Sequence, residues 1–202
     1  MSRDHPAGHF RLFVAIPLPE TVRDEVLRVQ RELQPLVPPS AARWTRPDQF
    51  HLTLRFLGNV PVEAVESLQQ SVEAVCRNAS PLALSARGVG FFPSQHSPRV
   101  VWVGINSQEN RLIDLQKGIE TAVAPFSPEP GEKSFAGHVT LGRLKNPRPA
   151  DVRVLVARAQ SYKAKAFGDW TAENVEIIRS ELSSIGTHYT LLGTFLLRAQ
   201  IR

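Results

Sequence analysis

Apolar residues recur along this chain with two different periods, and the two periods alternate. An apolar residue at every second position, or a short apolar run, predicts a strand, whereas a spacing of three to four residues predicts one face of a helix. Strands are expected at residues 10–16, 50–57, 82–92, 99–105, 138–144, 173–181 and 188–197. Helices are expected on apolar stripes that begin near Val22, Val62, Leu112 and Val152. This order indicates a mixed α/β or α+β fold.

Each half of the chain carries a similar series of elements. A strand and a helix are followed by a strand that bears the letters His-x-Thr-Leu, and another helix comes after it. Such an echo predicts two similar lobes, although a series of unrelated α/β units would produce the same pattern. Before the second His-x-Thr-Leu strand, residues 127–134 are polar and contain Pro and Gly, which is typical of an exposed loop.

The repeated letters His-x-Thr-Leu occupy residues 51–54 and 138–141. On a strand, side chains two positions apart stand on one face, about 6.5 Å from each other. The histidine and the threonine of each copy are therefore expected to point together, and the leucines to the opposite face. In the first copy, the same alternation puts Phe56 with the leucines. It puts Arg55 beside the histidine, where this cation either contacts a substrate phosphate or is simply solvated.

This pairing of side chains suits acid–base chemistry at a phosphorus centre. Imidazole has an unperturbed pKa of about 6.5, so both of its forms are accessible near neutrality. If the two strands approach each other, His51 and His138 can act as general base and general acid on opposite sides of a phosphate. The hydroxyls of Thr53 and Thr140 can donate hydrogen bonds to its non-bridging oxygens. The alternative is an ordinary solvated strand face, which is common for threonine-rich strands.

A third copy, at residues 188–191, means that spacing alone allows any two of the three histidines to pair. A metal site is a further alternative, but no third His, Asp or Glu stands near these strand histidines at ligand spacing. His5 and His9 fall in a polar N-terminus and His96 in a segment with Ser and Pro, so these three histidines are assigned no role.

Composition narrows the class of protein. The chain has 202 residues, of which 42% are hydrophobic, and a formal net charge of +5. This length and hydrophobic content are enough for a hydrophobic core and exclude a disordered or collagen-like chain.

The location of the protein is predicted from what the sequence lacks. The longest apolar run, residues 12–16, is too short to cross a membrane, and the N-terminus lacks the apolar stretch of a signal peptide. The single cysteine, Cys76, cannot form an internal disulfide, and its place beside a helical apolar stripe indicates an inert thiol. A soluble, cytoplasmic protein is expected.

Positive charge is densest just after the second copy of the motif. Residues 143–165 hold seven basic residues and one acidic residue. Two explanations stay open, namely attraction of a polyanion such as RNA and a helix with a solvated basic face. Aromatic residues also leave two explanations open, because they can stack on a base but in strand-like runs are more often core. These residues are Trp44, Phe91, Phe92 and Trp102.

Longer stretches of the sequence resemble one known family. They are RLFVAIP at 11–17, Trp44 followed by FHLTLRFLG at 50–58, PRVVWVG at 98–104 and HVTLGR at 138–143. In these stretches the chain is similar to the two-histidine (2H) phosphoesterases, and most of all to their RNA 2′,3′-cyclic phosphodiesterase branch, historically called 2′-5′ RNA ligases. The resemblance implies an α+β, bilobal fold, in which two pseudo-twofold-related lobes with antiparallel sheets and flanking helices surround a central cleft. Residues 10–202 would form this single domain, after a flexible N-terminus at residues 1–9.

The resemblance also separates the three copies of the motif. It implies that His51 and His138 are catalytic, with His138 as the base and His51 as the acid. It places His188 in a closing strand, where Tyr189 looks like a packing residue.

Contacts with the substrate phosphate are implied by the resemblance for Thr53, Thr140 and Arg143. By strict alternation, Arg143 would point away from Thr140. Its contact with substrate therefore requires the strand to bend or to end near Gly142.

The reaction implied by the resemblance is hydrolysis of a 2′,3′-cyclic phosphate, on an RNA end or a nucleotide, to a 2′-phosphate. No metal, no cofactor and no membrane is expected to take part, and a monomer is expected. Two alternatives stay open. One is a 2H enzyme that acts on another cyclic or 2′-5′ phosphodiester, with ATP-independent 2′-5′ RNA ligation as a side activity. The other is a non-enzymatic RNA-binding module that uses the basic surface.

Overall fold

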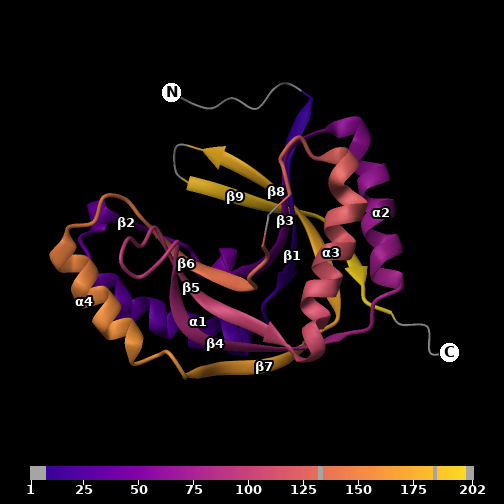
Figure 1. Cartoon of the computed structure of the whole chain (residues 1–202). Coiled ribbons are helices and arrows are strands. Elements are labelled where there is room, and N and C mark those ends of the chain that lie inside the picture. The colour runs from indigo at the N-terminus through magenta and orange to yellow at the C-terminus, as the bar shows by residue number, and fades with distance from the viewer. Residues whose placement is uncertain (1–7, 132–133, 184–185, 199–202) are drawn as a thin grey trace.

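Two antiparallel β-sheets and four α-helices form the fold in the computed structural model, which describes residues 8–131, 134–183 and 186–198 (Figure 1). The strands are β1 (His9–Pro17), β2 (Ala42–Trp44), β3 (His51–Pro61), β4 (Leu82–Phe92), β5 (Val100–Ser107), β6 (His138–Leu144), β7 (Ala166–Ala172), β8 (Asn174–Ser183) and β9 (Gly186–Leu196). The helices are α1 (Glu20–Leu33), α2 (Val65–Arg77), α3 (Arg111–Val123) and α4 (Pro149–Gln160). The strand orders are β3-β1-β8-β9 and β2-β6-β5-β4-β7, and neighbouring strands run antiparallel. The α+β prediction with antiparallel sheets is confirmed.

Two of the helices, α1 and α3, are exchanged between the two sheets. α1 follows a strand of the four-stranded sheet but packs against β7 of the five-stranded sheet. α3 follows a strand of the five-stranded sheet but packs mainly against β3 of the other. α2 lies beside α3, and α4 lies near α1, as Figure 1 shows on its right and left sides. α1 and α3 therefore each cover the sheet opposite to the one that holds the preceding strand.

The apolar stripe of α1 illustrates why the sequence folds in this way. Val22, Val26, Val29 and Leu33 recur every three or four residues, and all four are buried. They join one continuous core that also contains inward-facing residues of both sheets. A fully buried Val or Leu stabilises the folded chain by about 1.5–3 kcal/mol relative to an exposed one. The two sheets therefore depend on a shared hydrophobic core.

Two short strands, β2 and β7, are missing from the sequence prediction. β2 has only three residues, too few to display a period. β7 contains Gly168 and Asp169, residue types that are depleted in strands, although Phe167 and Ala172 are buried. Pairing of β2 with β6, and of β7 with β4, overrides these weak local preferences.

Cys76 lies on the buried face of α2 rather than beside it. Burial raises the pKa of its thiol to about 12, so a reactive thiolate is essentially absent near neutral pH.

The structure begins close to the expected domain boundary. Residues 1–7, including His5, lie outside the described residues, and with them most of the expected flexible N-terminus. His9 is the first residue of β1, so the first strand starts within the segment expected to be flexible. No helix in the described part of the chain is long and apolar enough to cross a membrane.

Candidate active site

The two strands that carry the His-x-Thr pairs lie beside each other. β3 is the edge strand of the four-stranded sheet, and it contacts β6 of the five-stranded sheet. His51 and His138 consequently line one cleft of about 210 Å³, together with Thr53, Thr140 and Arg143. The fold thus brings together the five residues for which the sequence predicts a catalytic or substrate-binding role.

A β-bulge in β6 turns Arg143 into the cleft. β5 pairs consecutive residues with Gly142 and Thr140, which leaves Leu141 without an opposite residue. The alternation resets at this point, so that Gly142 is buried while Arg143 is exposed and lines the cleft. This is the bend that a contact between Arg143 and substrate requires.

An equivalent bulge at Leu54 in β3 overturns two expectations. β1 pairs consecutive residues with Arg55 and Thr53 and leaves Leu54 without an opposite residue. Arg55 is thereby turned away from the cleft and buried, so the prediction that it shares a face with the histidine of its motif is wrong. Phe56, expected on the buried face, is 41% exposed and lines the cleft. Phe56 occupies in the first copy the place that Arg143 occupies in the second.

Arg55 is a structural cation, and it contacts neither the cleft nor bulk solvent. Its Nε lies 3.0 Å from Oε2 of Glu120 on α3. Its two terminal nitrogens donate to the carbonyl oxygens of Glu129 (2.6 Å) and Pro130 (3.0 Å). Arg55 therefore ties β3 both to α3 and to the loop that precedes β6.

Two buried glutamines bond to the bulges. Gln30 on α1 donates from Nε2 to the carbonyl oxygen of Leu141 (2.8 Å) and to that of Thr45 (2.6 Å). Gln116 on α3 donates to the carbonyl oxygen of Leu54 (3.4 Å). A buried carbonyl without a partner costs about 1–3 kcal/mol, so these side chains stabilise both bulges. The two copies of the motif are thus supported by equivalent contacts from exchanged helices.

Aromatic rings and burial hold His51 in place. Its ring stacks on Phe13 with the centroids 4.7 Å apart and meets the ring of Tyr189 edge-on at 5.6 Å. It also forms a hydrogen bond with the backbone of Gln49. Burial, with a smaller contribution from the charge of nearby His138, lowers the pKa of His51 to about 4. Without a bound anion, His51 is therefore neutral at neutral pH.

His138 is oriented in a corresponding way from the other sheet. Its Nδ1 lies 2.8 Å from the carbonyl oxygen of Ala136, and because a carbonyl only accepts, Nδ1 carries the proton of the neutral ring. Nε2 then bears the lone pair. Phe92 and Trp102 contact the ring with centroids 5.0 Å and 6.4 Å away, so they orient this histidine. Of the aromatic residues considered for base stacking, Trp44 lines the cleft.

The third copy of the motif does not contribute its histidine. His188 is exposed and is not among the residues that line the cleft. Its neighbours Thr187 and Tyr189 do line it. Tyr189, expected only to pack, contacts Phe13 and His51 and also borders the cleft, because alternation along β9 turns it inward.

β2, which the sequence pattern misses, supplies Arg43 and Trp44 to the cleft. Arg43 stands opposite Arg143 in the β2–β6 ladder and donates to Oγ1 of Thr187 (3.3 Å). Trp44 packs over Gly142, where a Cβ would lie 2.7 Å from its ring. Two arginines from adjacent strands therefore give one wall of the cleft a positive charge suited to phosphate. The sequence offers one sign of β2, because Trp44 is among the residues that carry the family resemblance.

The basic segment at residues 143–165 does not form a single charged face. Arg148 is ion-paired with Asp151 (2.8 Å), and Arg158 with Glu32. Lys165 lies over aromatic rings, 5.4 Å from the ring centroid of Tyr162. These contacts account for part of the charge, while Arg143 faces the cleft, and Lys145 and Arg153 line a separate hollow.

No group of three or more His, Cys, Asp or Glu side chains that could hold a metal ion occurs within residues 8–131, 134–183 and 186–198.

Burial of His51 makes folding depend on pH. Its pKa is about 4 when folded and about 6.5 when unfolded, so between these values the unfolded chain binds more protons. We expect the free energy of unfolding to fall by up to about 3 kcal/mol as the pH drops from 6.5 to 4, through this group alone. Denaturant unfolding of the parent and of His51→Asn at several pH values measures this contribution. The difference between the two should change over that window, and parallel curves would refute the desolvation of His51.

Two equivalent strand-borne His-x-Thr pairs that face one cleft define the fold of the 2H phosphoesterases. A family model described as LigT like Phosphoesterase matches residues 16–102. The RNA 2′,3′-cyclic phosphodiesterase of Thermus thermophilus is 33% identical over 94% of this chain and 91% of its own length. The protein of the same name from Methanothermobacter thermautotrophicus is 31% identical over 93% of this chain and 98% of its own. The crystal structure of TT0787 of Thermus thermophilus matches with a TM-score of 0.77 at 31% identity, over 94% of this chain and 99% of that one. The chain belongs to the RNA 2′,3′-cyclic phosphodiesterase family of LigT-like 2H phosphoesterases.

Proposed function

We propose that this protein hydrolyses the 2′,3′-cyclic phosphate at the end of an RNA, or of a nucleotide, and leaves a 2′-phosphate. The observation that carries the proposal is the placement of two His-x-Thr pairs from different sheets on one cleft with Arg143. Family membership supports the same substrate class, because both relatives named above are RNA 2′,3′-cyclic phosphodiesterases.

In the proposed mechanism, His138 is the general base and His51 the general acid. Nε2 of His138 takes a proton from water as the water oxygen attacks phosphorus. The bond between phosphorus and the 3′ oxygen breaks, and His51 gives its proton to that oxygen. The hydrogen bond from Nδ1 of His138 to Ala136 supports the base role, because it leaves the lone pair on Nε2.

The low pKa of His51 has a consequence for its role as the acid. In the cleft without substrate, His51 is neutral, so it has to gain a proton when substrate binds. A phosphate anion beside the ring raises the pKa of the imidazole, because opposite charge stabilises the imidazolium form. The pH profile of kcat/KM reports on the protein without substrate, so one of its limbs is expected near pH 4. The pH profile of kcat reports on the complex, so the corresponding limb is expected at a higher pH.

The remaining residues bind the phosphate. The hydroxyls of Thr53 and Thr140 donate to its non-bridging oxygens from opposite sides, and the guanidinium of Arg143 pairs with its charge. Each hydrogen bond to a charged oxygen contributes on the order of 1.5–3 kcal/mol. Arg43 adds a second cation on the same wall.

Replacing Phe56 by alanine is expected to weaken binding of the terminal nucleotide without slowing chemistry at saturation. An aromatic ring that is 41% exposed in a cleft offers a face on which a base can stack. Stacking is worth about 1–3 kcal/mol per base, so KM should rise about 5- to 150-fold. Steady-state kinetics with a nucleoside 2′,3′-cyclic monophosphate measure the change. Phe56→Tyr, which keeps the ring, is the control, and a loss confined to kcat would contradict the stacking role.

The proposed reaction is tested directly by product analysis in EDTA. The substrates are the four nucleoside 2′,3′-cyclic monophosphates and an oligoribonucleotide that ends in a 2′,3′-cyclic phosphate. We expect full turnover in chelator and a 2′-phosphate product, identified by nuclear magnetic resonance of phosphorus. A 3′-phosphate product, or activity lost in EDTA and restored by a divalent metal, would overturn the proposed mechanism. Binding without turnover of any cyclic or 2′-5′-linked substrate would favour the non-enzymatic alternative.

A further inference from the structure

A second and larger cavity lies between α4 and the ends of β5 and β6. It has a volume of about 830 Å³, against about 210 Å³ for the cleft. Three segments surround it, namely residues 95–99, residues 144–149 and the face of α4 that bears Val152 and Val156. We call this cavity the α4 hollow. Its volume falls within the range of roughly 300–1,000 Å³ that is typical of sites for small organic ligands.

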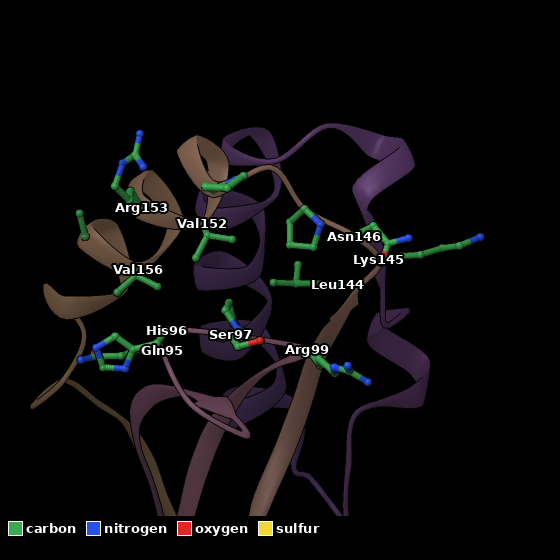
Figure 2. A pocket seen from close by; sticks show the side chains of 14 residues that line it. Gln95, His96, Ser97, Arg99, Leu144, Lys145, Asn146, Val152, Arg153 and Val156 are labelled. Atoms are coloured by element: carbon green, nitrogen blue, oxygen red, sulfur yellow. The ribbon is translucent and has the colours of Figure 1, made fainter.

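Apolar side chains form the interior of the α4 hollow. Val152 and Val156 point into it from α4, and Leu144 approaches them from the end of β6, as Figure 2 shows. Leu144 can do so because the bulge in β6 places it on the helix side of the sheet, while Arg143 faces the cleft. Such an interior is suited to the flat, weakly polar face of a nucleobase.

The rim of the α4 hollow is basic. Arg99, Lys145 and Arg153 belong to its lining, and no Asp or Glu does. None of these three cations has an ion pair within the described part of the chain. Arg99 and Lys145 extend outward from the apolar interior, where their charges can meet a ligand that passes over the end of the sheet (Figure 2). The charge and the apolar interior together match a single-stranded nucleic acid, which carries phosphates along one side and bases along the other.

The α4 hollow and the cleft are separate cavities, and residues at the end of β6 line both of them. Arg143 lines the cleft, and Lys145, two residues further on, lines the α4 hollow, so the two sites begin about 7 Å apart along the strand. The amide of Leu144 donates to the carbonyl oxygen of Arg99 (2.8 Å), which places Arg99 at the same end of the sheet. An RNA whose terminal phosphate is in the cleft can continue only in its 5′ direction. A path from Arg143 past Lys145 keeps its backbone beside unpaired cations.

We infer that the α4 hollow is a second subsite for RNA, which holds a base upstream of the terminal cyclic phosphate while Arg99, Lys145 and Arg153 bind the adjoining phosphates. This inference rests on the proposed function, because that function places the RNA end in the cleft. With this subsite, the protein should prefer an oligoribonucleotide to a mononucleotide as substrate. The cleft alone does not predict that preference.

The test compares a nucleoside 2′,3′-cyclic monophosphate with a cyclic-phosphate-ended oligoribonucleotide of about five nucleotides, since sites for single strands take about four or more. Val156→Trp fills the α4 hollow. Val154→Trp is the matched control, because Val154 is on the same helix but is 53% exposed and does not line the cavity. We expect Val156→Trp to raise KM for the oligonucleotide about tenfold, which corresponds to a loss of about 1.4 kcal/mol of binding free energy. Turnover of the monophosphate should be unchanged in both variants.

The salt dependence of oligoribonucleotide affinity tests the role of the three cations independently of the apolar interior. Fluorescence anisotropy measures binding of an oligoribonucleotide of the same length that ends in a 3′-phosphate, in the parent and in Arg99→Ala, Lys145→Ala and Arg153→Ala. Each change should reduce the slope of log affinity against log salt by about 0.7, because one phosphate contact is lost. Lys117→Ala, which removes an exposed cation on α3, should leave the slope unchanged.

The outcomes distinguish the inference from the proposed function. Absence of turnover with both substrates refutes the proposed function, and the binding assay then still judges the α4 hollow. Two results overturn the inference and leave the proposed function standing. One is normal turnover with no gain from chain length, and the other is an equal KM for the oligonucleotide in Val156→Trp and Val154→Trp. If Val156→Trp does not fold, as judged by its thermal transition, the three cation variants decide. Unchanged salt slopes in all three would then refute the subsite.

Discussion

Replacing either His51 or His138 by alanine is expected to lower the rate of cyclic-phosphate hydrolysis by about 10²–10⁴-fold. Each variant loses one proton transfer, and a positioned acid or base contributes a factor of this size. Each histidine forms a hydrogen bond with the backbone and contacts aromatic rings. The expected loss of rate is therefore that of a positioned acid or base. Single-turnover rates with a cyclic-phosphate-ended oligoribonucleotide measure the effect.

His188→Ala is the matched control for these two variants. It removes the same kind of side chain from the third copy of the motif, but His188 is exposed and does not line the cleft. Its rate should equal that of the parent. The double variant of His51 and His138 should be scarcely slower than either single variant, because residues that act as a unit are non-additive. A loss confined to His188→Ala would mean that a different pair of histidines is catalytic.

A substrate with a better leaving group separates the acid from the base. When sulfur replaces the 3′ bridging oxygen, the departing thiolate needs no proton, since a thiol has a pKa of about 8.5. The variant that lacks the acid should then recover most of its rate, whereas the variant that lacks the base should not. We expect recovery in His51→Ala. Recovery in His138→Ala instead would reverse the two roles. The test is needed because the low pKa of His51 leaves its ring neutral without substrate, and a neutral ring can also act as a base.

The sequence predicts the outline of the site well, because the histidines and threonines lie on regular strands. Strict alternation holds from His51 to Thr53 and from His138 to Thr140, and each pair lines the cleft as expected. Beyond each threonine the alternation fails, since a bulge adds one residue. No local preference in the sequence marks the bulges, because they depend on buried glutamines that are distant in the chain.

The error at Arg55 and the bend required for Arg143 have the same physical origin. A contact between Arg143 and substrate requires a bend near Gly142, whereas the prediction for Arg55 rests on a regular strand at the equivalent place in the first copy. The structure contains a bulge in both. Applied to both copies, the same reasoning would have turned Arg55 inward and Phe56 into the cleft.

Replacing Arg55 by methionine is expected to destabilise the protein by about 3–5 kcal/mol. Arg55 is 5% exposed, and its removal leaves the carboxylate of Glu120 without its cation and two carbonyl oxygens without their donor. Breaking a buried ion pair by removing one partner has a cost of this size. Urea unfolding at pH 7 measures it. Arg77→Met is the matched control, because Arg77 pairs with Glu73 on the exposed surface of α2 and should cost no more than about 1 kcal/mol.

Further variants at Arg55 separate its ion pair from its hydrogen bonds to the loop. Arg55→Lys keeps a charge near Glu120 but lacks the planar fork that reaches both carbonyls, so its stability should be intermediate. The double variant Arg55→Met, Glu120→Met removes the uncompensated charge and should recover part of the lost stability, but not the part due to the loop carbonyls. Because that loop leads to the carbonyl of Ala136, which bonds to His138, the lysine variant should also show a lower kcat at temperatures where it is fully folded. Equal stability of parent and Arg55→Met would refute the structural role of Arg55.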